Sequence, residues 1–190
     1  MRNFFTVVVL IFSIGYCYGQ LASNASIKEV SISHKRFTYP TPSQTKNSLF
    51  YIQRSNNASA IVYDGNRNEQ DELNPINPID VYWMSYNQDS LRNELNYFQR
   101  KFAYGVVVYP KGEKNEFEIS LVSYKKKRIH IFKNDFGEMQ ANMMIGGKMA
   151  RFRNVYVEVL KNFLFPEIAY VEVFGEDLET GEPVYERIIP

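Results

Sequence analysis

From Val106 to the C-terminus the sequence repeats one pattern, a short alternating run of residues followed by a tight turn. Within Phe117–Leu121, for example, apolar residues occupy every second position, which is the period of a strand with one buried face. Turn signals such as Gly146–Gly147 separate successive runs. Tight turns join antiparallel neighbours, whereas parallel pairing needs long crossovers. The sequence therefore predicts a mainly β, antiparallel fold.

The same pattern extends to two earlier runs, Leu49–Arg54 and Ser59–Asp64, and brings the expected total to about ten short strands. A barrel or a two-sheet sandwich is the natural arrangement for so many short strands. We expect one β-rich domain over 48–190. The preceding segment, 20–47, is rich in Ser, Thr, Pro and Asn and lacks periodicity, so we interpret it as a linker or extended arm.

The stretch Ile79–Tyr109 departs from this pattern and predicts a strand, a helix and a strand. Its middle part has apolar residues at helical spacing, namely Leu91, Leu95, Phe98 and Phe102. Ser90 suits the helix N-cap and Gly105 suits the position after the C-cap. We therefore expect one helix over about 90–104, packed on the sheet through this apolar stripe.

Alternation changes phase in the run that begins at Lys148. Ala150 and Phe152 occupy one face, whereas Val155 and Val157 would require the other. Such a slip is typical of a β-bulge, in which one extra residue shifts the strand. We expect a bulge or break near Arg153–Asn154.

The first nineteen residues have the features of a signal peptide. Arg2 provides a positive start, Phe4–Ile14 is apolar, and Cys17–Gly19 resembles a cleavage site. We expect cleavage before Gln20, an exported protein in the periplasm or outside the cell, and no transmembrane segment after cleavage. Lipid anchoring through Cys17 is not expected, because Tyr16 rather than a small residue precedes it.

Composition excludes several functions. Cys17 is the only cysteine. Cleavage before Gln20 would remove it, and the remaining chain could then form no disulfide, no catalytic thiol and no cysteine-ligated zinc site. Arg2 is the only charged residue of the signal segment, which leaves 21 Lys and Arg against 21 Asp and Glu. A neutral domain gives no electrostatic case for nucleic acid. There is no phosphate-cradling glycine loop, and His34 and His130 are the only histidines. We expect no cofactor and no metal.

Several motifs together resemble one known family. They are Leu49–Asn56, Ile61–Tyr63, Asn77–Trp83, Gln99–Gly105, and Glu172–Gly175 with Thr180–Gly181. In order and spacing these motifs are similar to a bacterial family known as domain of unknown function 4833. The resemblance covers roughly Ser48–Ile188. It implies a small exported bacterial protein and carries no activity or catalytic residue with it.

The candidate binding residues centre on Arg54, which shares a strand face with Phe50 and Ile52. A partly buried arginine needs an anionic partner. Asp80 or Glu94 could supply it in an internal ion pair, the interpretation we favour, and a ligand carboxylate is the alternative. The complete set is Gln53, Arg54, Trp83, Gln99, Arg100 and Tyr104. We hypothesise that Gln99 and Arg100 reach towards Gln53 and Arg54.

Three further features of the sequence each suggest an alternative function. Glu158 and Glu172 lie on successive strands and would serve a glycosidase-like hydrolase if they converged, but we expect both to face solvent. The polar loop Asn66–Pro78 is expected to be a solvated surface, or the exposed element of a structural interaction module. The run Lys125–Arg128 is expected to be a solubilising hairpin tip, with attraction of anionic lipid or polysaccharide as the alternative.

Taken together, the sequence favours a non-catalytic protein that binds a ligand or another envelope component. The expected partner is a small molecule, a carbohydrate or an envelope protein. This expectation follows from the many tyrosines, the barrel-like strand count and the lack of a catalytic signature.

Overall fold

The structure is a computed structural model that describes residues 40–86, 90–112, 115–160 and 167–190. The expected signal peptide over 1–19, Cys17 and most of the expected linker lie outside the described residues. The strands are β1 (Ser48–Arg54), β2 (Ser59–Gly65), β3 (Ile79–Ser85), β4 (Leu91–Glu94), β5 (Val106–Pro110), β6 (Glu116–Leu121), β7 (Tyr124–Lys133), β8 (Met139–Ile145), β9 (Lys148–Leu160), β10 (Glu167–Asp177) and β11 (Pro183–Ile188). A helical turn, α1 (Tyr97–Gln99), continues as a π-helical segment, η3 (Arg100–Tyr104).

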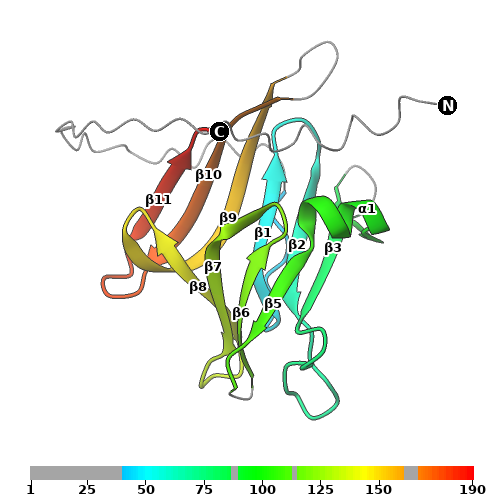
Figure 1. Cartoon of the computed structure of the whole chain (residues 1–190), viewed down its shortest axis with the longest axis vertical. Helices are drawn as coiled ribbons and strands as arrows, with labels where there is room; N and C mark the ends of the chain where they lie inside the picture. Colours follow the sequence, from blue (N-terminus) through cyan, green and yellow to red (C-terminus); the bar gives the residue numbers. More distant parts are fainter. Residues whose placement is uncertain (1–39, 87–89, 113–114, 161–166) are drawn as a thin grey trace.

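Nine strands form one curled, open sheet in the order β4-β3-β2-β1-β9-β8-β7-β6-β5, as Figure 1 shows. The sheet branches at β9, which also pairs with β10, and β10 pairs with β11. Among the described strands every pairing is antiparallel except β1 with β9, which runs parallel from Tyr51↔Asn154 to Arg54↔Val157. The expectation of a mainly β, antiparallel fold is therefore confirmed, with one parallel contact between distant parts of the chain.

The core fills the inside of the curl. Its centre is aromatic, because the Phe50 ring stacks on Tyr63 at 4.3 Å and contacts Phe152 at 4.5 Å between ring centroids. Aliphatic side chains from the facing strands, such as Ile119 and Ile131, are fully buried around this centre. A smaller cluster formed by Ala60, Val62 and Tyr82 covers the opposite face of β2 and β3.

The expected helix over about 90–104 is wrong at its beginning. Leu91–Glu94 form strand β4, which pairs with β3 from Ser85↔Leu91 to Tyr82↔Glu94. The helical part begins after Asn96, whose side chain accepts from Gln99 N–H while the Gln99 side chain accepts from Asn96 N–H. This capping box fixes the start, and Ser90 is not the cap.

The expected apolar stripe does not face the core either. Leu95 alone is buried, whereas Leu91, Phe98 and Phe102 are about half exposed or more. Gly105 ends the helical segment for a reason other than positive φ. Its φ is −65°, but a Cβ there would lie 1.9 Å from the carbonyl oxygen of Arg100. Glycine is required at position 105 because the backbone of Arg100 lies too close to leave room for a side chain.

The expected irregularity in β9 is confirmed. Its ladder with β10 pairs Phe174 with Asn154 and then Gly175 with Phe152, so Arg153 is the extra residue. Strand β9 continues through this bulge over its whole length. The bulge moves Val155 to the buried side of the strand. Ala150 and Phe152 before the bulge and Val155 after it are therefore all buried.

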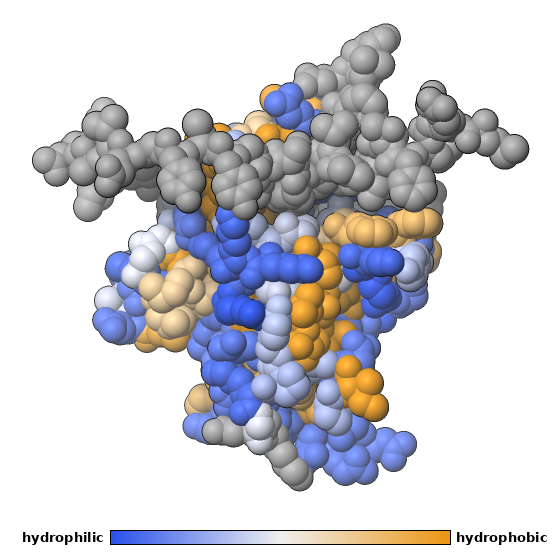
Figure 2. All heavy atoms as spheres, in the orientation of Figure 1, coloured by the Kyte–Doolittle hydropathy of each residue, from blue (hydrophilic) through white to orange (hydrophobic). Residues whose placement is uncertain are grey.

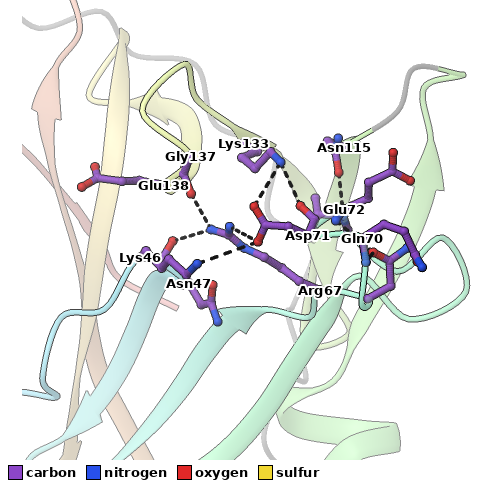
Figure 3. A network of polar contacts seen from close by, with 12 residues as sticks. Lys46, Asn47, Arg67, Gln70, Asp71, Glu72, Asn115, Lys133, Gly137 and Glu138 are labelled. Atoms are coloured by element: carbon purple, nitrogen blue, oxygen red, sulfur yellow. Dashed lines mark hydrogen bonds and ion pairs between the residues drawn. The ribbon is translucent and has the colours of Figure 1, made fainter.

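The loop Asn66–Pro78 is a structural clamp (Figure 3). Glu69 and Asp71 are exposed, as expected of a solvated loop, but the expectation is wrong for Arg67. The Arg67 side chain is only 7% exposed. The guanidinium donates to the Lys46 carbonyl at 2.9 Å, to the Gly137 carbonyl at 2.7 Å and to the Asp71 carboxylate at 2.8 Å. These contacts tie the β2–β3 connection to the entry into β1 and to the β7–β8 turn.

Two more contacts fasten the same loop to the far side of the curl. Lys133 Nζ donates to the Asp71 carbonyl at 2.8 Å, and Leu73 N–H donates to the Asn115 side chain at 2.6 Å. The Leu73 side chain is buried in the core. The loop therefore closes one end of the curled sheet.

In the described part of the chain no helix is long and apolar enough to cross a membrane.

Candidate functional site

Arg54, Trp83 and Tyr104 meet at the end of the sheet away from the clamp. Arg54 is the last residue of β1, Trp83 belongs to β3, and Tyr104 ends η3. The guanidinium carbon of Arg54 lies 5.2 Å from the Trp83 ring centroid and 5.8 Å from that of Tyr104. Both distances are within the range of a cation–π contact. The structure thus brings together three of the six candidate residues.

The two rings form a rigid support for the guanidinium. They contact each other edge to face, with centroids 5.3 Å apart and planes at 79°, and both pack against the main core. Tyr63 holds the end of η3, because its hydroxyl donates to the Tyr104 carbonyl at 2.8 Å. A fully buried Tyr63 therefore fixes the backbone that carries one wall of the site.

The favoured internal ion pair of Arg54 is absent among the described residues. Asp80 accepts from Arg92 at 2.8 Å, and Glu94 accepts from Arg92 at 3.0 Å and from Arg100 at 3.3 Å. These cations lie next to both acids on or after β4, a strand that the sequence did not predict. Within the described part of the chain no carboxylate pairs with Arg54.

Two N–H donors at the site have no acceptor among the described residues. They are Arg54 Nε and Trp83 Nε1, both buried at the atom itself. Burying a donor without an acceptor costs about 1–3 kcal/mol, and more when the group is charged. The aromatic rings near the guanidinium offer only a weak π acceptor to such N–H groups. An anionic oxygen placed beside either N–H would supply a missing acceptor.

The environment is apolar as well as cationic. Burial raises the pKa of Tyr104, while the positive charge of Arg54 acts in the opposite direction. Burial also raises the pKa of Tyr63 well above its usual value. Both phenols are therefore neutral near pH 7. The positive charge of the site comes from Arg54.

The other three candidate residues lie apart from this group. Gln53 faces the opposite side of β1, is buried, and donates from Nε2 to the Pro40 carbonyl at 3.1 Å. Gln99 serves as half of the capping box, and Arg100 pairs with Glu94. The side chains of Gln99 and Arg100 are thus engaged within the β4–η3 segment.

The carboxylates considered for hydrolysis differ from expectation. Glu172 does not face solvent: it is 3% exposed, and one carboxylate oxygen accepts from Arg187 at 2.6 Å and from Tyr185 at 3.1 Å. Strand register explains this, since β11 places Arg187 directly opposite Glu172. Glu158 accepts from the Tyr156 hydroxyl at 2.7 Å. Both acids are thus engaged with neighbours on the sheet.

No group of three His, Cys, Asp or Glu side chains is placed to hold a metal ion in the part of the chain that the structure describes. His130 lies with Nε2 2.6 Å from a Glu116 carboxylate oxygen. It faces outward on β7 beside Phe132, whose ring it stacks on at 5.0 Å.

Tyr63 was not predictable as a supporting residue, because its hydroxyl meets the Tyr104 carbonyl across 41 positions of the chain.

Residues 50–187 match the family described as Domain of unknown function (DUF4833). No curated protein and no solved structure matches the chain.

Proposed function

We propose that this chain, which belongs to the DUF4833 family, binds a small carboxylate-bearing ligand at Arg54, Trp83 and Tyr104. One observation carries the proposal: the buried donors Arg54 Nε and Trp83 Nε1 have no acceptor among the described residues. A guanidinium edge recognises a carboxylate through two parallel hydrogen bonds. The aromatic support holds that edge in place before the ligand arrives.

The site also favours a particular kind of group attached to the ligand's carboxylate. Trp83 and Tyr104 present aromatic surface next to the cation, so an apolar or carbohydrate-like group attached to the carboxylate would pack against them. The main core behind both rings limits their movement. Little ordering is then needed on binding, which favours affinity.

Binding without catalysis is the function we favour, in an exported protein of the periplasm or the exterior. The signal-like residues Met1–Gly19 support export. The rival, a carboxylate-dependent hydrolase, has less support, because Glu172 is engaged by Arg187 and Tyr185. A structural interaction module presenting the loop Asn66–Pro78 also has less support, because that loop is clamped to the sheet.

Tryptophan fluorescence tests the proposal. Trp83 is the only tryptophan of the chain, so its emission reports this site alone. The probes are decanoate, benzoate and galacturonate, each compared with its uncharged amide. We expect at least one carboxylate to change the emission saturably, and its amide to bind at least tenfold more weakly, since a charged hydrogen-bonded pair contributes about 1.5–3 kcal/mol.

The variant Arg54→Gln should abolish the response, and Arg92→Gln is the matched control. Arg92 also lies over an aromatic ring, that of Tyr82 at 4.0 Å, but it already pairs with Asp80 and Glu94. Equal responses from both variants would contradict the assignment of the site.

A further inference from the structure

The run Lys125–Arg128 is a bulge inside β7, and the expectation of a hairpin tip is wrong. Strand β6 pairs with β7 at Ile119↔Ile129 and again at Leu121↔Tyr124. Between these pairs, Ser120 alone faces the four basic residues. On the other side, pairing of β7 with β8 stops at His130↔Asn142. The basic run therefore leaves the ladder on both sides.

A groove of about 490 Å³ opens on the outer face where β7 and β8 diverge. Its lining includes Glu118, Lys126, Lys127, Arg128, Met144 and Met149. Two of these side chains, Met144 and Met149, are 46% and 49% exposed. Seen from the side drawn in Figure 1, hydrophilic and apolar side chains lie next to each other on the surface of the molecule (Figure 2).

The cations of the groove differ in how they are engaged. Lys127 pairs with Glu186, and Lys111 lies 3.5 Å from Glu116. Lys126 and Arg128 are exposed and have no carboxylate partner among the described residues. Arg128 is held flat against the Tyr109 ring, with its guanidinium carbon 3.4 Å from the centroid. Its N–H edge is thereby left for an external acceptor.

We propose that this groove binds the anionic headgroup of an amphiphile, with Lys126 and Arg128 contacting the headgroup and Met144 and Met149 contacting the first part of its hydrocarbon chain. Charge complementarity is the first argument, because Lys126 and Arg128 have no carboxylate partner among the described residues, and Glu118 of the lining lies 3.7 Å from Lys111. The second is the pair of exposed methionines, since flexible thioethers suit irregular apolar ligands. The groove is separate from Arg54 and does not depend on the ligand proposed there.

Partition onto lipid vesicles tests this inference. The whole exported chain is mixed with vesicles of phosphatidylcholine containing phosphatidylglycerol, and with vesicles of phosphatidylcholine alone. We expect binding to the anionic vesicles only. The variant Lys126→Ala/Arg128→Ala should bind roughly 30-fold more weakly, the factor for two cations that contribute about 1 kcal/mol each. The control Lys46→Ala/Arg153→Ala removes two cations elsewhere and should bind like the unchanged chain.

A second variant, Met144→Ser/Met149→Ser, separates an amphiphile from a plain polyanion. We expect roughly tenfold weaker binding, because half-exposed methionines would no longer contact hydrocarbon. Soluble dihexanoyl phosphatidylglycerol should compete, whereas inorganic phosphate at equal concentration should not. No binding to the anionic vesicles would overturn the inference. Equal loss in the control, unchanged binding of the methionine variant, or full competition by phosphate would also overturn it.

Discussion

The guanidinium carbon of Arg54 lies 5.2 Å from the centre of the Trp83 ring, and no carboxylate of the described residues pairs with it. The acids that would have served as partners, Asp80 and Glu94, are engaged by Arg92. A half-buried cation held by aromatic rings alone is an arrangement that costs stability unless a ligand completes it. The ligand-binding proposal rests on this relationship.

Replacing Arg54 by an apolar residue of similar length should cost little stability. We expect Arg54→Met to change the free energy of unfolding by less than about 1 kcal/mol, because loss of a cation–π contact is offset by removal of an unpaired buried donor. Urea unfolding measures the change. A loss of about 3 kcal/mol or more is the result expected for a broken buried ion pair, and it would show that Arg54 has a structural partner.

Arg67 should behave in the opposite way. Its buried guanidinium holds two backbone carbonyls and Asp71. We therefore expect Arg67→Ala to lower the free energy of unfolding by about 2–4 kcal/mol. The lysine variant should recover little, since a single ammonium cannot reproduce the fork of contacts.

The matched control for Arg67 is Arg92→Ala. Its side chain is 47% exposed, and exposed ion pairs contribute about 0–1 kcal/mol. Urea unfolding of the two variants side by side gives the comparison. Similar losses for both would contradict the interpretation of the loop Asn66–Pro78 as a clamp.

Gly105 is required by close contact rather than by backbone conformation. A Cβ at this position would meet the carbonyl oxygen of Arg100, the first residue of η3, at 1.9 Å. We expect Gly105→Ala to cost more than about 2 kcal/mol and to displace Tyr104 from Trp83. Thermal melts and Trp83 emission measure the two effects.

Gly137→Ala provides the comparison for Gly105. Its φ is 76° and its Cβ would meet nothing within 4 Å, so only the cost of the left-handed conformation applies, about 1 kcal/mol. A cost for Gly105→Ala no larger than that for Gly137→Ala would show that η3 adjusts without strain.

Asp177 should make the fold sensitive to acid. Hydrogen bonds from the Lys148 ammonium and the Glu179 N–H lower its pKa below 3.8. A carboxyl whose pKa is lower in the folded chain stabilises the fold above its unfolded pKa, and this stabilisation is lost as pH falls through the folded pKa. We expect Asp177→Asn to flatten the decrease of melting temperature between about pH 5 and pH 2. An unchanged decrease would contradict the assignment.

Alternation of residues was enough to predict the class of fold, because a buried face imposes a period of two on any strand. It also located the bulge at Arg153, since a change of phase is visible in the sequence. The parallel contact of Arg54 with Val157 was not predictable. It joins segments about a hundred positions apart, and nothing local to either one specifies the other.

The helix over about 90–104 was mispredicted for a physical reason. Leu91 and Leu95 have helical spacing, but Arg92 makes a cation–π contact with Tyr82 and an ion pair with Asp80 across the β3–β4 ladder. These tertiary contacts outweigh a weak local preference. Because the acids on this ladder have their own cations, the same error hid the unpaired state of Arg54.

Native mass spectrometry of the exported protein, purified from its own host, is the decisive test of ligand binding at Arg54. We expect an acidic small molecule bound one to one to the unchanged chain and to Arg92→Gln, and absent from Arg54→Gln. A chain that carries no bound molecule, or one that Arg54→Gln retains in full, would contradict a carboxylate site at Arg54, Trp83 and Tyr104.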